Sequence, residues 1–158
     1  MIDTTNILIV DDEEVVRHSH LRSLVGTDYN TQVAEDGRRA LRVMEQSPCD
    51  VILLDLCLPD LDGIEVLKTL KQRWPDAEVV VITGYPTIES AKEAVRLGAF
   101  NYLAKPVGPG EVIKATNDAM TQKRWAMRTE SQDRYPTEPD RYQPFVDLYP
   151  YNEQGGKS

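Results

Sequence analysis

The sequence predicts an α/β protein with a doubly wound, five-stranded parallel sheet, five helices and a C-terminal extension. Three apolar runs carry most of that prediction, at residues 6–10, 50–54 and 78–82. The runs are continuous rather than alternating, which is typical of parallel strands that are covered by helices on both faces. The segments between them have helical spacing, and regular alternation of strands and helices favours a parallel sheet with right-handed crossovers.

The remaining elements follow from weaker signals. Shorter strands are predicted at residues 31–34 and 100–103. Apolar residues at helical spacing predict helices over residues 13–25, 38–46, 64–73 and 87–97, and a last helix from Pro109 to about Met127. Gly98 is a suitable residue to end the fourth helix, and the proline suits the first turn of the fifth.

We expect residues 1–128 to form one domain, followed by a tail at 129–158 that is too short to be an output domain. The tail holds four of the ten prolines and four of the seven tyrosines. This composition favours a flexible segment. Its apolar residues, among them Phe145 and Leu148, keep docking on the domain or on a partner as an alternative.

Charge and cysteine content restrict the function classes. The net charge of −8 argues against bulk electrostatic attraction to nucleic acid or to anionic membranes. Cys49 and Cys57 fit neither a disulfide framework nor a zinc site, which favours a reducing compartment. The first residues lack the features of a secretory signal, and no apolar run approaches the ~20 residues of a membrane span. We therefore expect a cytoplasmic protein that binds neither nucleic acid nor membranes.

Chemically active side chains follow four of the five predicted strands. They are Asp11, Asp12 and Glu13 after the first strand, Asp55 after the third, Thr83 after the fourth and Lys105 after the fifth. The carboxyl ends of parallel strands meet at one edge of the sheet, where ligands bind in open α/β folds. We therefore expect these side chains to form one site.

Three carboxylates in one site need positive charge nearby. Two carboxylates ~4 Å apart repel by roughly 4 kcal/mol at an effective dielectric constant near 20. Carboxylates with water ligands suit Mg²⁺, and a lysine amine offsets the charge of an incoming phosphoryl group. A carboxylate nucleophile, a divalent ion and hydrogen-bond donors are the groups that phosphoryl transfer to an aspartate needs.

Each residue alone also has a structural explanation. An aspartate such as Asp12 after a strand often caps the next helix, and Glu13 can serve the same role. Asp55 alone would be a loop carboxylate, Thr83 a strand-end residue and Lys105 a surface amine. Their joint placement at matching strand ends favours the functional interpretation.

The motifs around these residues resemble the receiver domains of bacterial two-component systems. The similar segments are Val10-Asp11-Asp12-Glu13, Leu54-Asp55-Leu56-Cys57-Leu58-Pro59, Asp62-Gly63, Val81-Ile82-Thr83-Gly84 and residues 98–106. The resemblance covers about residues 5–125. It implies a flavodoxin-like sheet with the strand order 2-1-3-4-5, and a cis peptide bond between Lys105 and Pro106.

The resemblance also implies a phosphoacceptor and a metal site. Asp55 would accept the phosphoryl group. Asp12 and Asp55 would bind Mg²⁺ directly, with Mn²⁺ as an alternative ion. Asp11 would act through a metal-bound water, and Cys57 would contribute its backbone carbonyl. Cys57 and Tyr85 also flank the site at positions that tune the phosphoryl lifetime in the family.

A conformational switch is the third implication. Lys105 would contact the phosphoryl group, Thr83 would move toward it, and the switch aromatic Tyr102 would then turn inward. The implied phosphoryl donor is a sensor histidine kinase or a phosphotransfer protein. The face of the fourth helix, fifth strand and last helix would bind a downstream protein of unknown identity or a second copy of the chain. That face lies near Glu89, Lys92, Arg96, Tyr102 and Lys114.

The favoured function is therefore a phosphorylation-driven signalling switch, rather than an enzyme for external substrates. A phosphatase of the haloacid-dehalogenase type needs a second aspartate two residues after its nucleophile, where this chain has Cys57. A flavin or nucleotide binder lacks its glycine-rich loop here, and Asp11 and Asp12 would repel phosphate. A degenerate receiver that serves only as a scaffold is a third alternative, and the intact site argues against it.

Three further side chains are assigned conventional roles. Cys57 as a redox sensor is disfavoured, because nothing in the sequence marks its thiol as unusually acidic. His18 and His20 lie two residues apart and so do not share a helix face. We expect both to be surface histidines rather than phosphotransfer residues.

Overall fold

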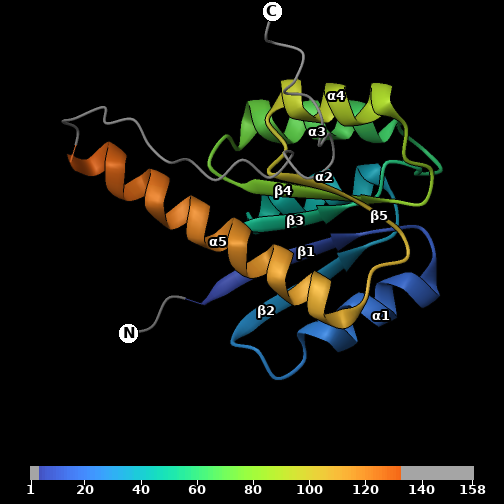
Figure 1. The fold of residues 1–158 in the computed structure, drawn as a ribbon, viewed down its shortest axis with the longest axis horizontal. Helices are drawn as coiled ribbons and strands as arrows, with labels where there is room; N and C mark the ends of the chain where they lie inside the picture. The colour runs from blue at the N-terminus through green and yellow to red at the C-terminus, as the bar shows by residue number, and fades with distance from the viewer. Residues whose placement is uncertain (1–3, 133–158) are drawn as a thin grey trace, which may run out of the picture.

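The structure is a computed structural model that describes residues 4–132. Its centre is a parallel sheet of five strands in the order β2-β1-β3-β4-β5 (Figure 1). The strands are β1 Thr5–Val10, β2 Tyr29–Ala34, β3 Val51–Leu54, β4 Glu78–Thr83 and β5 Asn101–Ala104. The predicted fold class and strand order are both confirmed.

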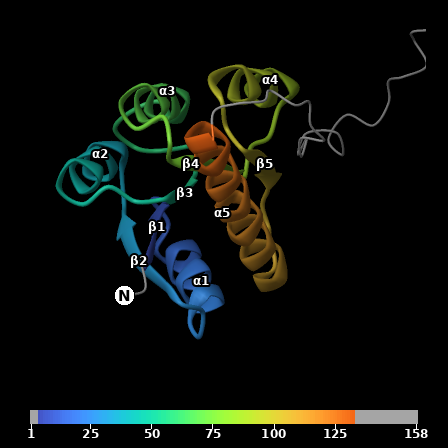
Figure 2. The same cartoon turned by 90° about the vertical axis from the view of Figure 1, so that its left-hand side faces the viewer.

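Five helices cover the two faces of the sheet. They are α1 Glu14–Leu24, α2 Gly37–Gln46, α3 Gly63–Arg73, α4 Ile88–Leu97 and α5 Pro109–Gln132. Helices α1 and α5 lie on one face, and α2, α3 and α4 lie on the other (Figure 2). The crossover from β1 to β2 runs in one direction along the sheet, and the crossovers from β2 to β3, β4 and β5 run in the other, so right-handed connections place α1 on one face and α2, α3 and α4 on the other. Within residues 4–132, none of the helices has the length and apolar character that a bilayer crossing requires.

Helix α5 is longer than the sequence pattern predicts. It ends at Gln132 instead of near Met127, and its last four residues belong to the segment interpreted as a tail. Those residues are all polar, so no apolar pattern in the sequence indicates that the helix continues through them. Extending an existing helix through good helix formers such as Glu130 and Gln132 needs no new nucleation. The rest of the predicted tail lies outside the described residues, and the division at 128/129 stays a prediction.

Alternate residues of the central strands enter two separate cores. In β1, Leu8 and Val10 face α2, α3 and α4, whereas Ile7 and Ile9 face α1 and α5. All four side chains are at most 1% exposed. Full burial of one such aliphatic side chain stabilises the fold by roughly 1.5–3 kcal/mol. Because both faces of the strand are buried, the sequence run is continuously apolar.

Local signals fix both ends of α4, which lies beside the functional edge of the sheet. Thr87 and Ser90 form a capping box, in which Ser90 N donates to Thr87 Oγ1 at 3.0 Å and Thr87 N donates to Ser90 Oγ at 3.4 Å. Gly98 ends the helix as predicted, with a φ of 98° that favours glycine. The loop between β4 and α4 is therefore anchored on the helix side.

Gly63 allows the loop after β3 to fold back on itself. The Gly63 N–H donates to the Leu56 carbonyl at 3.2 Å, and a Cβ atom at position 63 would overlap the Leu56 backbone. The overlapping atoms belong to main chain, which cannot move aside as the end of a flexible side chain can. Only glycine fits this approach.

We predict that Gly63→Ala destabilises the protein by about 3 kcal/mol, because overpacking typically costs ~1–3 kcal/mol and a backbone clash lies at the upper end. Urea unfolding measures the change. Gly110→Ala, in the first turn of α5, is the matched control, since no other segment of the described chain comes within 4 Å of its Cβ position. The control should gain up to about 1 kcal/mol, because glycine is a poor helix former. Equal stability of wild type and G63A would contradict the predicted clash.

Candidate functional site

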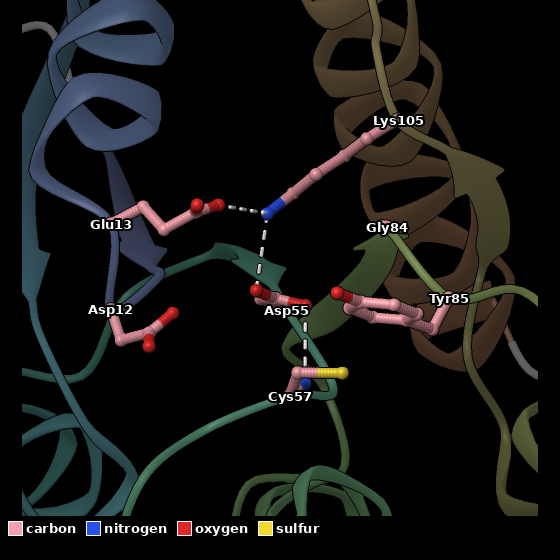
Figure 3. A pocket seen from close by; sticks show the side chains of 7 residues that line it. All are labelled: Asp12, Glu13, Asp55, Cys57, Gly84, Tyr85 and Lys105. Atoms are coloured by element: carbon pink, nitrogen blue, oxygen red, sulfur yellow. Dashed lines mark hydrogen bonds and ion pairs between the residues drawn. The ribbon is translucent and has the colours of Figure 1, made fainter.

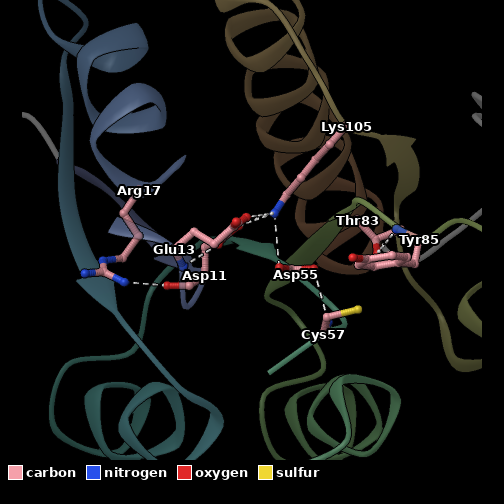
Figure 4. Close-up of polar contacts among 8 residues, drawn as sticks. All are labelled: Asp11, Glu13, Arg17, Asp55, Cys57, Thr83, Tyr85 and Lys105. Carbon is pink, nitrogen blue, oxygen red and sulfur yellow. Dashed lines mark hydrogen bonds and ion pairs between the residues drawn. The ribbon is translucent and has the colours of Figure 1, made fainter. Parts of the chain in front are cut away.

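The carboxyl ends of four strands bring the predicted site residues to one edge of the sheet (Figure 4). Asp11 directly follows β1, Asp55 follows β3, Thr83 ends β4 and Lys105 follows β5. The backbone ladder continues past the strand ends, with Asp55 N donating to the Val10 carbonyl at 3.0 Å. This backbone hydrogen bond therefore fixes the main chain of Asp55, from which the buried carboxyl side chain extends.

Three aspartates place carboxylate oxygens close together. One oxygen each from Asp11, Asp12 and Asp55 lies within 4.8 Å of the other two. Asp11 and Asp55 are 2% and 4% exposed, whereas Asp12 is exposed to solvent. Carboxylates this close repel one another strongly where water is scarce. The donor set consists of oxygen atoms and is open to solvent on one side, which fits Mg²⁺, an ion that prefers oxygen ligands and keeps several waters.

Lys105 brings a positive charge into the acidic cluster. Its Nζ lies 2.7 Å from Asp11 Oδ2 and 3.1 Å from Asp55 Oδ2, and its side chain is 14% exposed. The same amine lies 3.5 Å from Glu13 Oε1 (Figure 3). Desolvation opposes the charged amine, but the hydrogen bonds and charges of Asp11 and Asp55 outweigh it and raise the pKa of Lys105. The amine therefore stays protonated at neutral pH.

Asp55 is held in a conformation that disfavours its charged form. Burial is the main cause that raises the pKa of Asp55, and the charge of Asp11 acts in the same direction. The hydrogen bond from Cys57 N at 3.1 Å and the pairing with Lys105 act in the opposite direction but do not cancel the rise. A cation bound beside this carboxylate would relieve the unfavourable charge.

Thr83 and Lys105 approach the site from neighbouring strands. Thr83 pairs with Ala104 in the β4–β5 register and is fully buried. Its hydroxyl oxygen accepts a hydrogen bond from Tyr85 N at 3.2 Å. The peptide bond between Lys105 and Pro106 is cis, as predicted.

Tyr102 already points inward in this structure. Its side chain is 3% exposed, and its hydroxyl oxygen accepts a hydrogen bond from Thr87 N at 3.2 Å and contacts Ser90 Oγ. Thr87 and Ser90 are the capping-box residues of α4. The expected switch residue is therefore attached directly to the first turn of the helix that borders the site.

The cluster opens into a pocket of about 370 Å³ at the sheet edge (Figure 3). The lining residues are Asp12, Glu13, Asp55, Cys57, Gly84, Tyr85 and Lys105. In Figure 3 the two carboxylates from the β1–α1 loop lie across the pocket from Tyr85, with Asp55 between them. The pocket has room for a hydrated ion and a small anion, and in it the Lys105 amine pairs with the carboxylates of Glu13 and Asp55.

The sequence analysis did not predict the contacts that Glu13 and Arg17 make in the site. Glu13 occupies the N-cap position of α1, as the structural alternative held, but its side chain makes no capping hydrogen bond there and instead lies 3.5 Å from Lys105 Nζ. Arg17, on the first turns of α1, donates from Nη1 to the Asp11 carbonyl at 2.8 Å (Figure 4). This bond holds the acidic loop from the helix side. The sequence signal for this contact was a basic residue, Arg17, in the helix that follows the acidic end of β1.

The prediction of two surface histidines was wrong for His20. His18 is exposed, but His20 is 4% exposed, and its Nδ1 has no hydrogen-bond partner among residues 4–132. His20 lies four residues before Leu24, so both side chains project from the inner face of α1. Burial lowers the pKa of His20, which favours the neutral ring. The polar character of histidine suggested that His20 is exposed, whereas its helical spacing from Leu24 correctly indicates the buried face of α1.

Comparison with known proteins identifies the family. The response regulator receiver domain profile matches residues 7–117. The chain therefore belongs to the response regulator receiver domains of two-component systems, which are signalling domains and not classical enzymes. A receiver domain protein from Methanospirillum hungatei has a similar structure, with a TM-score of 0.76 and 26% identity over 78% of this chain and 99% of that one. The NtrX structure from Brucella abortus gives a TM-score of 0.77 and 28% identity, over 82% of this chain and 30% of that one.

Curated relatives are longer proteins. An NtrX-like response regulator from Rickettsia felis is 34% identical over 110 residues, and the regulatory protein AtoC from Escherichia coli is 38% identical over 106 residues. The matches cover 68% and 67% of this chain but 23% of each relative. This chain therefore corresponds to about a quarter of their length.

We predict that Asp55→Asn stabilises the metal-free protein by about 1 kcal/mol, because relief of strain at a functional site commonly has effects of this size. Urea unfolding in the presence of a chelator measures the change. Asp12→Asn is the matched control from the exposed side of the cluster, and its gain should be smaller because water screens its charge. A loss of stability in D55N would show that pairing with Lys105 outweighs the repulsion.

The same variant should change the pH dependence of stability. The pKa of Asp55 is raised in the folded protein above its ordinary value of 3.8. Its contribution to stability is therefore fully present below that value and is lost as the pH rises through the raised pKa. D55N should remove this contribution, so the difference in unfolding free energy between the variant and the wild type should grow from acid to neutral pH. A constant difference would contradict the raised pKa.

Proposed function

We propose that this receiver domain is a phosphorylation-driven switch in which Asp55 accepts the phosphoryl group with the help of Mg²⁺. The observation that carries the proposal is the arrangement of three aspartate oxygens within 4.8 Å of one another beside the Lys105 amine. This combination of a carboxylate nucleophile, an oxygen-rich cation site and a fixed amine matches the needs of phosphoryl transfer. A histidine kinase or a phosphotransfer protein would be the donor.

The metal would be held at the open side of the acidic cluster. Asp12 and Asp55 would bind Mg²⁺ directly, Asp11 would act through a water ligand, and the Cys57 backbone carbonyl would supply a further oxygen. Mn²⁺, which also favours oxygen ligands, would be an alternative. A bound divalent ion supplies charge neutralisation for the phosphoryl oxygens.

The chain's own residues would carry out the remaining tasks. An Asp55 carboxylate oxygen attacks the phosphorus atom, the O–P bond forms as the N–P bond to the donor histidine breaks, and the released nitrogen takes a proton from solvent. Lys105 already lies 3.1 Å from Asp55 Oδ2, so its amine is in place to neutralise a phosphoryl oxygen. The buried hydroxyl of Thr83 would donate a hydrogen bond to another phosphoryl oxygen.

The response would travel from Thr83 through Tyr102 to α4. The Tyr102 hydroxyl contacts both capping-box residues, so a shift of this ring changes the hydrogen bonds at the start of α4. The receiving surface is the face of α4, β5 and α5, for a downstream protein or for a second copy of the chain. Its exposed charged residues include Glu89, Lys92, Arg96 and Lys114.

The free thiols of the chain support a reducing location. Cys49 is buried, Cys57 is exposed, and neither forms a disulfide in the described part of the chain. Partial desolvation of the Cys57 thiol raises its pKa, and the charge of Asp55 adds to this effect, so the thiol is less reactive than an ordinary one. This argues against a redox-sensing role, and we propose the cytoplasm as the site of action.

We predict that acetyl phosphate and Mg²⁺ add the mass of one phosphoryl group to the intact protein, as measured by mass spectrometry. Asp55→Asn should abolish the gain, and a chelator should prevent it. Asp50→Asn is the matched control, because Asp50 pairs with Lys123 at the opposite edge of the sheet. This variant should be phosphorylated like the wild type. An unmodified wild-type protein that binds Mg²⁺ would favour the scaffold alternative.

We predict that Lys105→Ala binds Mg²⁺ at least as tightly as the wild type. The Lys105 amine lies 2.7 Å from Asp11 and competes with the cation for the same negative charge. Calorimetric titration with Mg²⁺ measures the affinity. The variant should nevertheless fail to change conformation when acetyl phosphate is added, as followed by tryptophan fluorescence or oligomeric state. A wild-type response in K105A would rule out the role assigned to the amine.

A further inference from the structure

The loop between β3 and α3, residues 55–62, is fastened at both of its ends. At its start, Cys57 N donates to Asp55 Oδ1 at 3.1 Å. Cys57 and Asp62 form an isolated antiparallel bridge across the loop, and Gly63 N donates to the Leu56 carbonyl at 3.2 Å. The peptide groups around Cys57, which line the pocket, are therefore part of a tight closed turn.

A third attachment joins the middle of this loop to a helix that is distant in sequence. Asp60 Oδ1 accepts from Gly37 N at 2.8 Å, and Asp60 Oδ2 accepts from Arg38 N at 2.9 Å. Both donors belong to the first turn of α2, where backbone N–H groups have no partner within the helix. The next N–H, that of Arg39, donates to the helix's own cap residue Asp36 at 2.8 Å. Two carboxylates thus share this helix end, but only Asp60 comes from the loop.

The two oxygens of Asp60 are matched to the helix end in geometry and charge. Although partial desolvation acts in the opposite direction, the hydrogen bonds from the Arg38 and Gly37 backbone lower the pKa of Asp60. A negative charge at a helix N-terminus also interacts favourably with the helix dipole. The Arg38 side chain adds little, because its nearest nitrogen lies 3.8 Å away and the side chain is 67% exposed. The two hydrogen bonds from the backbone of Gly37 and Arg38 therefore attach Asp60 to α2.

Close packing beneath Asp60 keeps the loop and helix in fixed relation. A Cβ atom at Gly37 would lie 2.9 Å from Val66 Cγ2 and 3.0 Å from Leu61 Cδ1. The absence of a side chain at position 37 therefore lets Leu61, the neighbour of Asp60, rest against the first turn of α2. The loop meets the helix as one packed unit.

We propose that Asp60 is a positioning residue for the metal site, which fixes the Cys57 peptide by tying the middle of the loop to α2. The inference rests on the proposed function, in which the Cys57 carbonyl is a ligand of Mg²⁺. This ion demands nearly ideal octahedral geometry, so a ligand peptide that moves weakens binding. Asp60 acts through Cys57, because residues 58 and 59 separate it from the pocket-lining residue.

The experiment compares Asp60→Ala with Asp36→Ala by calorimetric titration of each folded protein with Mg²⁺. Each variant removes one carboxylate from the same helix end, so the loss of charge is matched. D60A removes the acceptor of two N–H groups of α2, and D36A removes the acceptor of one. We expect D60A to raise the dissociation constant for Mg²⁺ about five-fold, somewhat less than the ~10–100-fold loss for direct outer-shell partners of a metal ligand. D36A should leave it within about two-fold of the wild type, since the Asp36 side chain accepts from Arg39 N within the helix end and not from the β3–α3 loop.

Two further variants test the attachment itself. Asp60→Asn keeps one carbonyl acceptor for one of the two N–H groups, so its affinity should lie between those of the wild type and D60A. It also replaces D60A if that variant does not fold. Arg38→Ala removes the long ion pair and keeps the backbone donor, so we expect its affinity for Mg²⁺ to be unchanged.

The outcomes separate this inference from the proposed function. Wild-type protein that does not bind Mg²⁺ would overturn both. Equal Mg²⁺ affinities of wild type and D60A would overturn the positioning role of Asp60 and leave the phosphoryl switch standing. Equal weakening by D36A and D60A would assign the effect to α2 or to net charge, and would also overturn the inference. Weakening confined to the Asp60 variants would support it.

Discussion

The attraction between Lys105 and two buried aspartates makes the functional edge of this protein tenable. Asp11 and Asp55 are almost completely buried, and their oxygens lie within 4.8 Å of each other and of Asp12. Without a counter-charge this arrangement would strongly disfavour folding. The amine of Lys105 crosses from β5 to reach both carboxylates. The protein thus holds a partly neutralised acidic cluster, the group that we propose binds a divalent cation.

The sheet topology explains how residues so far apart in sequence form this cluster. β1 and β3 are neighbours at the centre of the sheet, so Asp11 and Asp55 emerge side by side. β5 lies at the edge, and the length of a lysine side chain spans the remaining separation. The loops beyond β1 and β3 are each supported from outside, by Arg17 on α1 and by the start of α2 through Asp60. Rigid elements therefore position every group that the proposed chemistry uses.

The sequence was sufficient to predict the fold and the meeting of Asp11, Asp55 and Lys105 at one sheet edge, because both depend on simple rules. Continuous apolar runs identify buried parallel strands, and the ends of such strands share one edge. The features that it missed depend on contacts between segments or on competing signals. The role of Asp60 depends on its contact with α2, which no sequence pattern reveals, and His20 is a polar residue that lies on the inner side of its helix. The last residues of α5 are polar, so no periodic apolar pattern shows where the helix ends.

The length of α5 has a practical consequence for attaching labels. The helix begins beside the acidic edge and reaches the opposite edge of the sheet, where Lys123 pairs with Asp50 at 2.9 Å. Its 24 residues span about 36 Å at the rise of an α-helix. A fluorophore or fusion partner joined immediately after Gln132 would thus start far from the pocket. The attachment would therefore lie away from the acidic edge, where we propose that a donor protein docks.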